Sequence, residues 1–222
     1  MAIESQLNSA DHQVLQDMHG LVSGAGTYNY LEIGSYLGGS LQYALTSKNC
    51  VSATSVDTRL TGAINDERKI PYKYTVTTND MLAHLHENNL DTAKLQCIDG
   101  SIADVDQQGF SLAFIDGEHT VMATFSDALQ CLDRISEDSI LLFHDSWIVF
   151  SAIDCINLLL EKQQRKFVGY KFTDSAIYAI AFGKFIPALD SHAQGRSDNW
   201  KEYKHHAQLQ LSREILKNSR NT

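Results

Sequence analysis

The sequence predicts an α/β fold in which a mostly parallel sheet, with an antiparallel edge strand, carries helices on both faces. Short β-rich runs alternate with segments of helical periodicity, which is the pattern of a parallel sheet wrapped by helices. A glycine-rich turn, Gly34 to Gly39, follows the first of these runs. The last two runs are too close in sequence to be parallel neighbours, because a parallel crossover takes about a dozen residues or more.

The first half of the chain contains a leading helix and four strands. Apolar residues recur on one face of residues 9–22, which predicts the helix. The expected strands are Tyr28 to Ile33, Val51 to Val56, Lys94 to Ile98 and Ser111 to Ile115. Ser40 is placed to cap the helix after the glycine-rich turn, and Thr78 or Asn79 to cap the following one.

A polar stretch, residues 58–75, separates the second strand from the third helix. Gly62 and Pro71 interrupt it, so we expect a mobile loop or lid. Its basic and tyrosine side chains are candidates for contact with a substrate. They are Arg59, Arg68, Lys69, Tyr72 and Tyr74.

The second half continues the alternation. Apolar residues from Val121 to Ile135 recur at helical spacing. Ser139 to Phe143 is almost continuously apolar, as a central parallel strand should be, and a helix from Ile148 to Leu160 follows it. Lys166 to Phe172 and Ala176 to Phe182 form a predicted hairpin.

We expect residues 1–183 to form one domain and residues 184–222 a C-terminal helical extension. The extension has seven Lys or Arg against four Asp or Glu, whereas residues 1–183 have 11 against 23. Its apolar residues fall on one stripe of an amphipathic helix: Trp200, Tyr203, Ala207, Leu211 and Ile215. Such a stripe packs on the domain or on a second subunit of a homo-oligomer. A basic arm that grips an anionic substrate is the alternative.

Composition excludes several classes of function. The formal net charge of −9 argues against a nucleic-acid partner, because such proteins need a basic surface to displace counterions. No apolar run approaches the roughly 18 residues of a membrane span. The polar N-terminus resembles no targeting segment, and the four cysteines form no CxxC pair. We therefore expect a cytoplasmic protein with reduced thiols.

The segment from Leu31 to Ser40 carries the strongest chemical signal. Glycines after a strand let a ligand approach the backbone, and the N-terminus of the next helix offers unpaired N–H groups. Asp57 ends the second strand 25 residues after Glu32, where an acidic side chain can accept both hydroxyls of a ribose. Together these features indicate a nucleoside-containing cofactor.

Charge distinguishes between the possible cofactors. The dinucleotide fingerprint is GxGxxG, and Tyr36 stands here in place of its second glycine. Glu32, two residues before the turn, would repel a pyrophosphate but suits the sulfonium and ammonium groups of S-adenosylmethionine. The residues therefore favour S-adenosylmethionine, with an NAD-dependent oxidoreductase as the alternative enzyme.

Leu31 to Ser40 resembles the first motif of class I S-adenosylmethionine-dependent methyltransferases. Two further runs, Asp116-Gly117-Glu118-His119 and His144-Asp145, resemble those of small-molecule O-methyltransferases of the cephalosporin-pathway and macrolide-sugar type. The resemblance covers residues 28–183 and implies a Rossmann-like methyltransferase fold. It also implies methyl transfer from S-adenosylmethionine to a hydroxyl of a small-molecule acceptor, a sugar or a secondary metabolite. A non-catalytic scaffold with the same fold is the alternative.

The resemblance also implies roles for individual residues in binding the cofactor. Glu32, Gly34 and Ser35 would line its methionine end. Asp57 would hold the ribose, and Asp116 would lie under the sulfonium. The segment that matches the adenine contact is Asp99, Gly100 and Ser101.

The acceptor site admits two interpretations. Asp116 and Asp145 end strands that we expect to be neighbours, so with His144 they would bind Mg²⁺ or another divalent metal, which would lower the pKa of the acceptor hydroxyl. His144 replaces the usual acidic residue, and imidazole suits softer ions. In the metal-free alternative His119 or His144 is the general base, with Glu118 as a third candidate.

Overall fold

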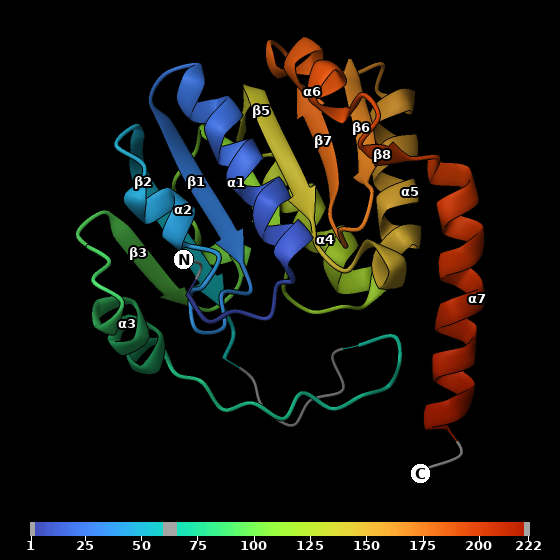
Figure 1. Ribbon diagram of the computed structural model, residues 1–222, viewed down its shortest axis with the longest axis horizontal. Coiled ribbons are helices and arrows are strands. Elements are labelled where there is room, and N and C mark those ends of the chain that lie inside the picture. The colour runs from blue at the N-terminus through green and yellow to red at the C-terminus, as the bar shows by residue number, and fades with distance from the viewer. Residues whose placement is uncertain (1–2, 60–65, 220–222) are drawn as a thin grey trace.

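A computed structural model describes residues 3–59 and 66–219, and its centre is an eight-stranded sheet (Figure 1). The strands are β1 (Tyr28–Ile33), β2 (Cys50–Asp57), β3 (Leu95–Asp99), β4 (Phe110–Ile115), β5 (Ile135–Phe143), β6 (Phe167–Phe172), β7 (Tyr178–Phe182) and β8 (Ser197–Asp198). Their order is β3-β2-β1-β4-β5-β7-β6-β8. β1 to β5 pair in parallel, and β7, β6 and β8 pair antiparallel to their neighbours. The predicted sheet and its C-terminal hairpin are confirmed.

Helices cover both faces of the sheet, as predicted. They are α1 (Ser9–Gly24), α2 (Gln42–Thr46), α3 (Thr78–Glu87), α4 (Val121–Leu132), α5 (Ser146–Lys162), α6 (Phe185–Ala193) and α7 (Trp200–Asn218), with a short 3-10 turn, η1 (Ile102–Asp104). In Figure 1, α1 crosses in front of the sheet and α4 lies behind it. Side chains alternate between the faces of the strands: Leu112 and Phe114 of β4 join the core under α1 and α6, whereas Ala113 and Ile115 join the core under α4 and α5.

The order of the strands places a crevice at one edge. The chain leaves β3 on one side of β1 and returns as β4 on the other, so the strand order reverses between β1 and β4. Ligands of open α/β sheets bind beyond the carboxyl ends of the strands at such a reversal. Asp57, Asp116 and Asp145 all lie at or just after the carboxyl ends of strands that share this edge.

Three details differ from the predictions. Ser40 does not cap α2, which begins at Gln42; its hydroxyl donates instead to Glu32, because a buried carboxylate needs donors. Thr77, one residue earlier than predicted, caps α3. Ile135 is not helical: α4 ends at Leu132, and Ile135 begins β5 opposite Phe110. Its spacing from Leu132 matched a helix, but periodicity cannot detect the turn between them.

The C-terminal residues add α6, β8 and α7 to the sheet and its covering layer. β8 pairs with β6, and Trp200 and Leu211 of α7 pack against the core on the α5 side. Of the two positions expected for this helix, the structure shows packing on its own domain. Within residues 3–59 and 66–219, no helix has the length and apolar character that crossing a bilayer requires. All four cysteines are free thiols.

Candidate functional site

A cavity of about 540 Å³ opens at the carboxyl edge of the sheet, where the sequence predicted a cofactor. The glycine-rich turn after β1, the ends of β2 and β4 and the segment after β3 line it. N-terminal residues 5–7 and residues 70–74 complete its wall. Six of the predicted cofactor residues line the cavity: Gly34, Ser35, Asp57, Gly100, Ser101 and Asp116.

Gly34 allows the ends of β1 and β4 to approach closely. Its φ is +82°, and a Cβ built there would lie 2.1 Å from the carbonyl oxygen of Asp116. Backbone hydrogen bonds hold the turn on both sides: the Gly34 N–H donates to Val56 and the Asp116 N–H donates to Ile33, each at 2.8 Å. Only glycine fits this position, so the turn and Asp116 are placed by one contact.

Asp57 faces the glycine-rich turn at the carboxyl end of β2. Its Oδ2 accepts the backbone N–H groups of Ser35 at 3.1 Å and Tyr36 at 3.3 Å. The guanidinium of Arg59 lies 3.2 Å from the same oxygen. The sequence did not predict this ion pair, and it places a cation beside the carboxylate.

Glu32 and Asp99 lie outside the cavity lining, unlike the other predicted cofactor residues. Glu32 is fully buried and accepts hydrogen bonds from the hydroxyls of Tyr30 at 2.6 Å and Ser40 at 2.7 Å. Burial raises its pKa to about 7, against the effect of those two donors. The Asp99 carboxylate accepts a hydrogen bond from Thr78. Glu32 therefore stabilises the glycine-rich turn by accepting the hydrogen bond of the Ser40 hydroxyl, which follows the turn.

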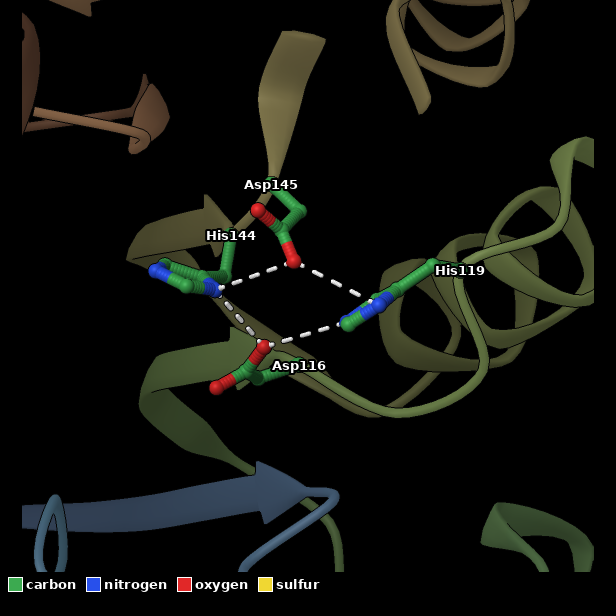
Figure 2. Close-up of side chains that lie close together, drawn as sticks. All are labelled: Asp116, His119, His144 and Asp145. Carbon is green, nitrogen blue, oxygen red and sulfur yellow. Dashed lines mark ion pairs between the residues drawn. The ribbon is translucent and has the colours of Figure 1, made fainter. Parts of the chain in front are cut away.

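Four side chains converge beside the cavity: Asp116, His119, His144 and Asp145. Figure 2 shows them pointing toward one another, and each offers a ligand atom within 4.8 Å of the others. His144 Nδ1 lies 2.9 Å from Asp116 Oδ1, and His119 Nδ1 lies 3.3 Å from Asp145 Oδ2. His119 Nε2 lies 3.5 Å from Asp116 Oδ1. The sequence predicted three members of this group as metal ligands and His119 only as a base.

Two carboxylates outside this group hold its histidines. Asp11 of α1 lies 3.2 Å from His144 Nε2, and Asp66 lies 3.7 Å from His119 Nδ1 while it also pairs with Arg68. Neither carboxylate was predicted from the sequence. The sequence contains a feature that could have identified Asp11, because this residue lies three positions before Val14 on the apolar stripe of the leading helix. An acid on the buried face of a helix needs a partner, and His144 is that partner.

The carboxylates determine the protonation of the histidines. Burial would lower the pKa of His119, but Asp116, Asp66 and Asp145 raise it to about 10. Burial would also lower the pKa of His144. Its contacts with Asp116, Asp11 and Asp145 outweigh this effect, so the pKa lies well above its ordinary value. In the absence of a bound cation, these carboxylates therefore favour the positively charged form of both rings. A protonated imidazole cannot act as a general base.

Glu118 is the third candidate base and lies in a different environment. Its side chain lines the cavity, is exposed, and accepts a hydrogen bond from the hydroxyl of Thr120 at 2.7 Å. It is therefore accessible to an acceptor molecule, unlike His144, which is buried and outside the cavity lining; His119 lines the cavity but is partly buried.

The four-residue group fits a divalent metal ion. His119 Nε2 and His144 Nδ1 are buried and make no hydrogen bond of good geometry to any described residue. Ligand atoms bound at about 2.1 Å to one ion lie roughly 3 to 3.5 Å apart. The ligand atoms of this group all lie within 4.8 Å of one another, close enough for small side-chain movements to bring them around one ion. Two imidazoles and two carboxylates are donors that first-row divalent ions accept.

The segment before α3 contributes aromatic side chains to the cavity wall. Tyr74 packs edge-on against Tyr36, with ring centroids 5.5 Å apart, and against Tyr72 at 5.6 Å. These tyrosines and Arg68 line the cavity, whereas Lys69 and Arg59 do not. Residues 60–65, with Gly62 of the expected loop, lie outside the described residues.

Two residues of the site have unusual backbone conformations. Tyr36 and Asp145 both have a φ of +46°, a backbone conformation that residues other than glycine rarely adopt. Tyr36 occupies the turn where a dinucleotide site has glycine, and Asp145 joins β5 to α5. Backbone strain of this kind concentrates at functional sites.

The comparisons with known proteins agree with this geometry. A family model described as a methyltransferase domain matches residues 31–146. The structure of the O-methyltransferase NovP aligns with a TM-score of 0.62 and 10% identity over 78% of this chain and 79% of that chain. The search of curated proteins finds no match.

Two further solved structures contain the cofactor or its product. The O-methyltransferase TomG from Streptomyces achromogenes, involved in tomaymycin synthesis and in complex with SAM, aligns with a TM-score of 0.54 and 11% identity over 77% of this chain and 80% of that chain. An O-methyltransferase from Bacillus cereus in complex with SAH aligns with a TM-score of 0.55 and 14% identity over 81% and 84%. At these identities the alignments establish the shared Rossmann-like fold.

Proposed function

The chain belongs to the methyltransferase domain family and has the fold of the S-adenosylmethionine-dependent enzymes, and from this we propose that it transfers a methyl group from S-adenosylmethionine to a hydroxyl of a small-molecule acceptor. One observation carries the proposal. Around Gly34, one cavity is lined both by the carboxylate that we assign to the ribose, Asp57, and by those that we assign to the reacting centre, Asp116 and Asp145.

The charges of the cavity support S-adenosylmethionine as the donor. Asp57 lines the cavity and would accept the ribose hydroxyls, and Ser35 lines it at the glycine-rich turn. Asp116 adds negative charge where a sulfonium would be stabilised. A pyrophosphate at the same turn would meet this charge and the bulk of Tyr36, which disfavours NAD.

We further propose that Asp116, His119, His144 and Asp145 hold a divalent metal ion. When bound, such an ion lowers the pKa of a coordinated hydroxyl and fixes its oxygen. The cation would also replace the protons that the two rings otherwise hold. The imidazoles then serve as ligands, which leaves the role of general base to another group.

Glu118 is the base that this arrangement favours. It lines the cavity two residues from Asp116 and is exposed to an acceptor. In the reaction the acceptor O–H proton passes to the Glu118 carboxylate as the oxygen attacks the methyl carbon. The C–S bond breaks, its electron pair stays on sulfur, and S-adenosylhomocysteine leaves. Positioning of the acceptor in line with the methyl group supplies the rest of the catalysis.

A binding comparison tests the donor. We expect S-adenosylhomocysteine to raise the melting temperature, because a ligand that binds only the native state stabilises it by mass action, and NAD to leave it unchanged. Stabilisation by NAD alone would refute the proposed donor.

A turnover assay then separates an enzyme from a scaffold. The protein is incubated with methyl-labelled S-adenosylmethionine and a panel of hydroxylated small molecules, including sugars, with and without a chelator. We expect label transfer that Glu118→Gln reduces about 100-fold, within the usual range for loss of a general base. Cofactor binding without transfer to any panel member would favour the scaffold.

A further inference from the structure

The imidazole of His144 is held between two carboxylates that come from distant parts of the chain. Asp116 Oδ1 lies 2.9 Å from Nδ1, and Asp11 Oδ2 lies 3.2 Å from Nε2. The ring is 8% exposed and Asp11 is 1% exposed. Nε2 therefore faces Asp11, Nδ1 faces Asp116 with Asp145 further away at 3.8 Å, and the ring has little contact with water.

Asp11 is itself fixed by the elements around it. Its Oδ1 accepts the Ser175 hydroxyl and the Ala176 N–H, both at 2.7 Å. Its Oδ2 accepts the N–H of Asn8 at 3.2 Å, as part of the capping box of α1. These donors require an acceptor, so the carboxylate stays ionised and cannot rotate away from His144.

An ionised acceptor at Nε2 selects one tautomer of the ring. A neutral imidazole has one N–H donor and one lone pair, and the hydrogen bond at one nitrogen decides which is which. Asp116 is an acceptor at Nδ1 in the metal-free site, but a cation bound to the group of four would take the place of a proton there, and Asp11 would hold the remaining ring proton on Nε2. The lone pair is then on Nδ1, which is buried, points at the group of four, and makes no hydrogen bond of good geometry to a described residue.

We propose that Asp11 is a positioning residue of the metal site, which presents His144 Nδ1 as a ligand and thereby makes the site select a first-row transition-metal ion such as Co²⁺, Mn²⁺ or Zn²⁺ over Mg²⁺. The inference rests on the proposed metal site and adds its selectivity and the role of α1. Mg²⁺ binds mainly to oxygen, whereas imidazole suits these ions, and two of the four ligands here are imidazoles.

Titration of the metal-free protein with Co²⁺ and with Mg²⁺ tests the selectivity. The absorption bands of Co²⁺ report nitrogen ligation, and competition gives the affinity for Mg²⁺. We expect Co²⁺ to bind at least about 100-fold more tightly than Mg²⁺. Equal affinities, or Co²⁺ bands without a nitrogen ligand, would refute the selectivity.

The Asp11→Asn variant tests the positioning role. Its amide oxygen would face Ser175 and Ala176, so its N–H₂ group would face His144 and move the ring proton to Nδ1. We expect the affinity for Co²⁺ to fall about 10- to 100-fold, the usual effect of losing an outer carboxylate. In a His144→Ala background the same change should have no further effect, because Asp11 acts through that ring.

Two variants of α1 serve as controls. Asn8→Ala removes the side-chain cap of the helix but not the contact with His144, and Asp17→Asn removes a carboxylate that pairs with Arg196. Both should bind Co²⁺ as the parent protein does, even where the melting temperature falls. If Asn8→Ala weakens Co²⁺ binding as much as Asp11→Asn, the role of Asp11 is only structural and the proposal fails.

The titrations need neither cofactor nor acceptor. Absence of Co²⁺ binding would overturn this inference and the metal site, while methyl transfer, measured separately, would stand or fall by its own assay.

Discussion

Replacement of Gly34 by alanine should damage both stability and function, because this residue sets the distance between β1 and β4. The new Cβ would lie 2.1 Å from the Asp116 carbonyl oxygen and 2.6 Å from the Gly117 Cα, both backbone atoms. Ordinary contact begins at 3.4 Å, so the two strand ends must separate by about 1 Å.

The expected loss of stability has two parts. A residue other than glycine at a φ of +82° costs about 1–2 kcal/mol, within the usual range for a strained backbone. Separation of the strand ends weakens the hydrogen bonds of Gly34 to Val56 and of Asp116 to Ile33, at about 1 kcal/mol each. Gly34→Ala should therefore lower the free energy of unfolding by about 3–4 kcal/mol.

Gly109 provides a matched control at the other end of β4. Its φ is +78°, and a Cβ there would meet no atom within 4 Å. Gly109→Ala should show only the strain of about 1–2 kcal/mol, with methyl transfer unchanged. Gly34→Ala should also lose about 100-fold in turnover, since a shift of about 1 Å at Asp116 misplaces the reacting groups.

Urea unfolding and label-transfer assays on both variants measure these effects. If Gly34→Ala is no less stable than Gly109→Ala, or keeps full turnover, then the close approach of β1 and β4 does not shape the site.

Three other predictions follow from the contacts of single groups. Asp57→Ala should weaken the binding of S-adenosylhomocysteine about 10-fold or more in calorimetry, whereas Asp99→Ala, outside the cavity lining, should change it little; equal losses would contradict the ribose assignment. A chelator should abolish turnover, and added Co²⁺ should restore it; full activity in the chelator would contradict the metal site. Burial lowers the pKa of His19 to about 3, so between pH 6.5 and 3 the unfolded chain binds a proton that the folded chain excludes. The free energy of unfolding should therefore fall on acidification by about 1.4 kcal/mol per pH unit from this group, and His19→Phe should remove that part of the slope in urea unfolding; parallel slopes would refute the shift.

The strands and the main helices were predictable because their signals are local. Apolar runs and helical periodicity located the strands β1 to β7 and every α-helix except α6, and the two central motifs fell at strand ends where the fold places them. The errors lie at boundaries. Ile135 continued a helical spacing by coincidence, and Ser40 was drawn away from capping by the needs of a buried carboxylate.

The candidate site was predictable only in part. Gly34, Asp57 and Asp116 lie in the cavity because turn chemistry and strand ends are visible in the sequence. Glu32 was placed at the cofactor, but it is fully buried and reaches the turn through Ser40. How deeply a side chain is buried depends on which residues pack over it, and its position near the end of a strand in the sequence does not show this.

The sequence by itself determined the class of the fold, the edge of the sheet that carries the site and the acidic character of that edge. The first follows from the alternation of strands and helices along the chain, and the other two from the residues at the ends of the strands. Only the tertiary structure shows that Asp11, more than 100 residues before His144, contacts the ring of His144. It also shows that the ring of His119 faces Asp116, which His144 contacts as well. Such contacts depend on how α1 and the ends of the strands pack together. The raised pKa values of both histidines arise from the carboxylates that this packing places beside them, against the effect of burial.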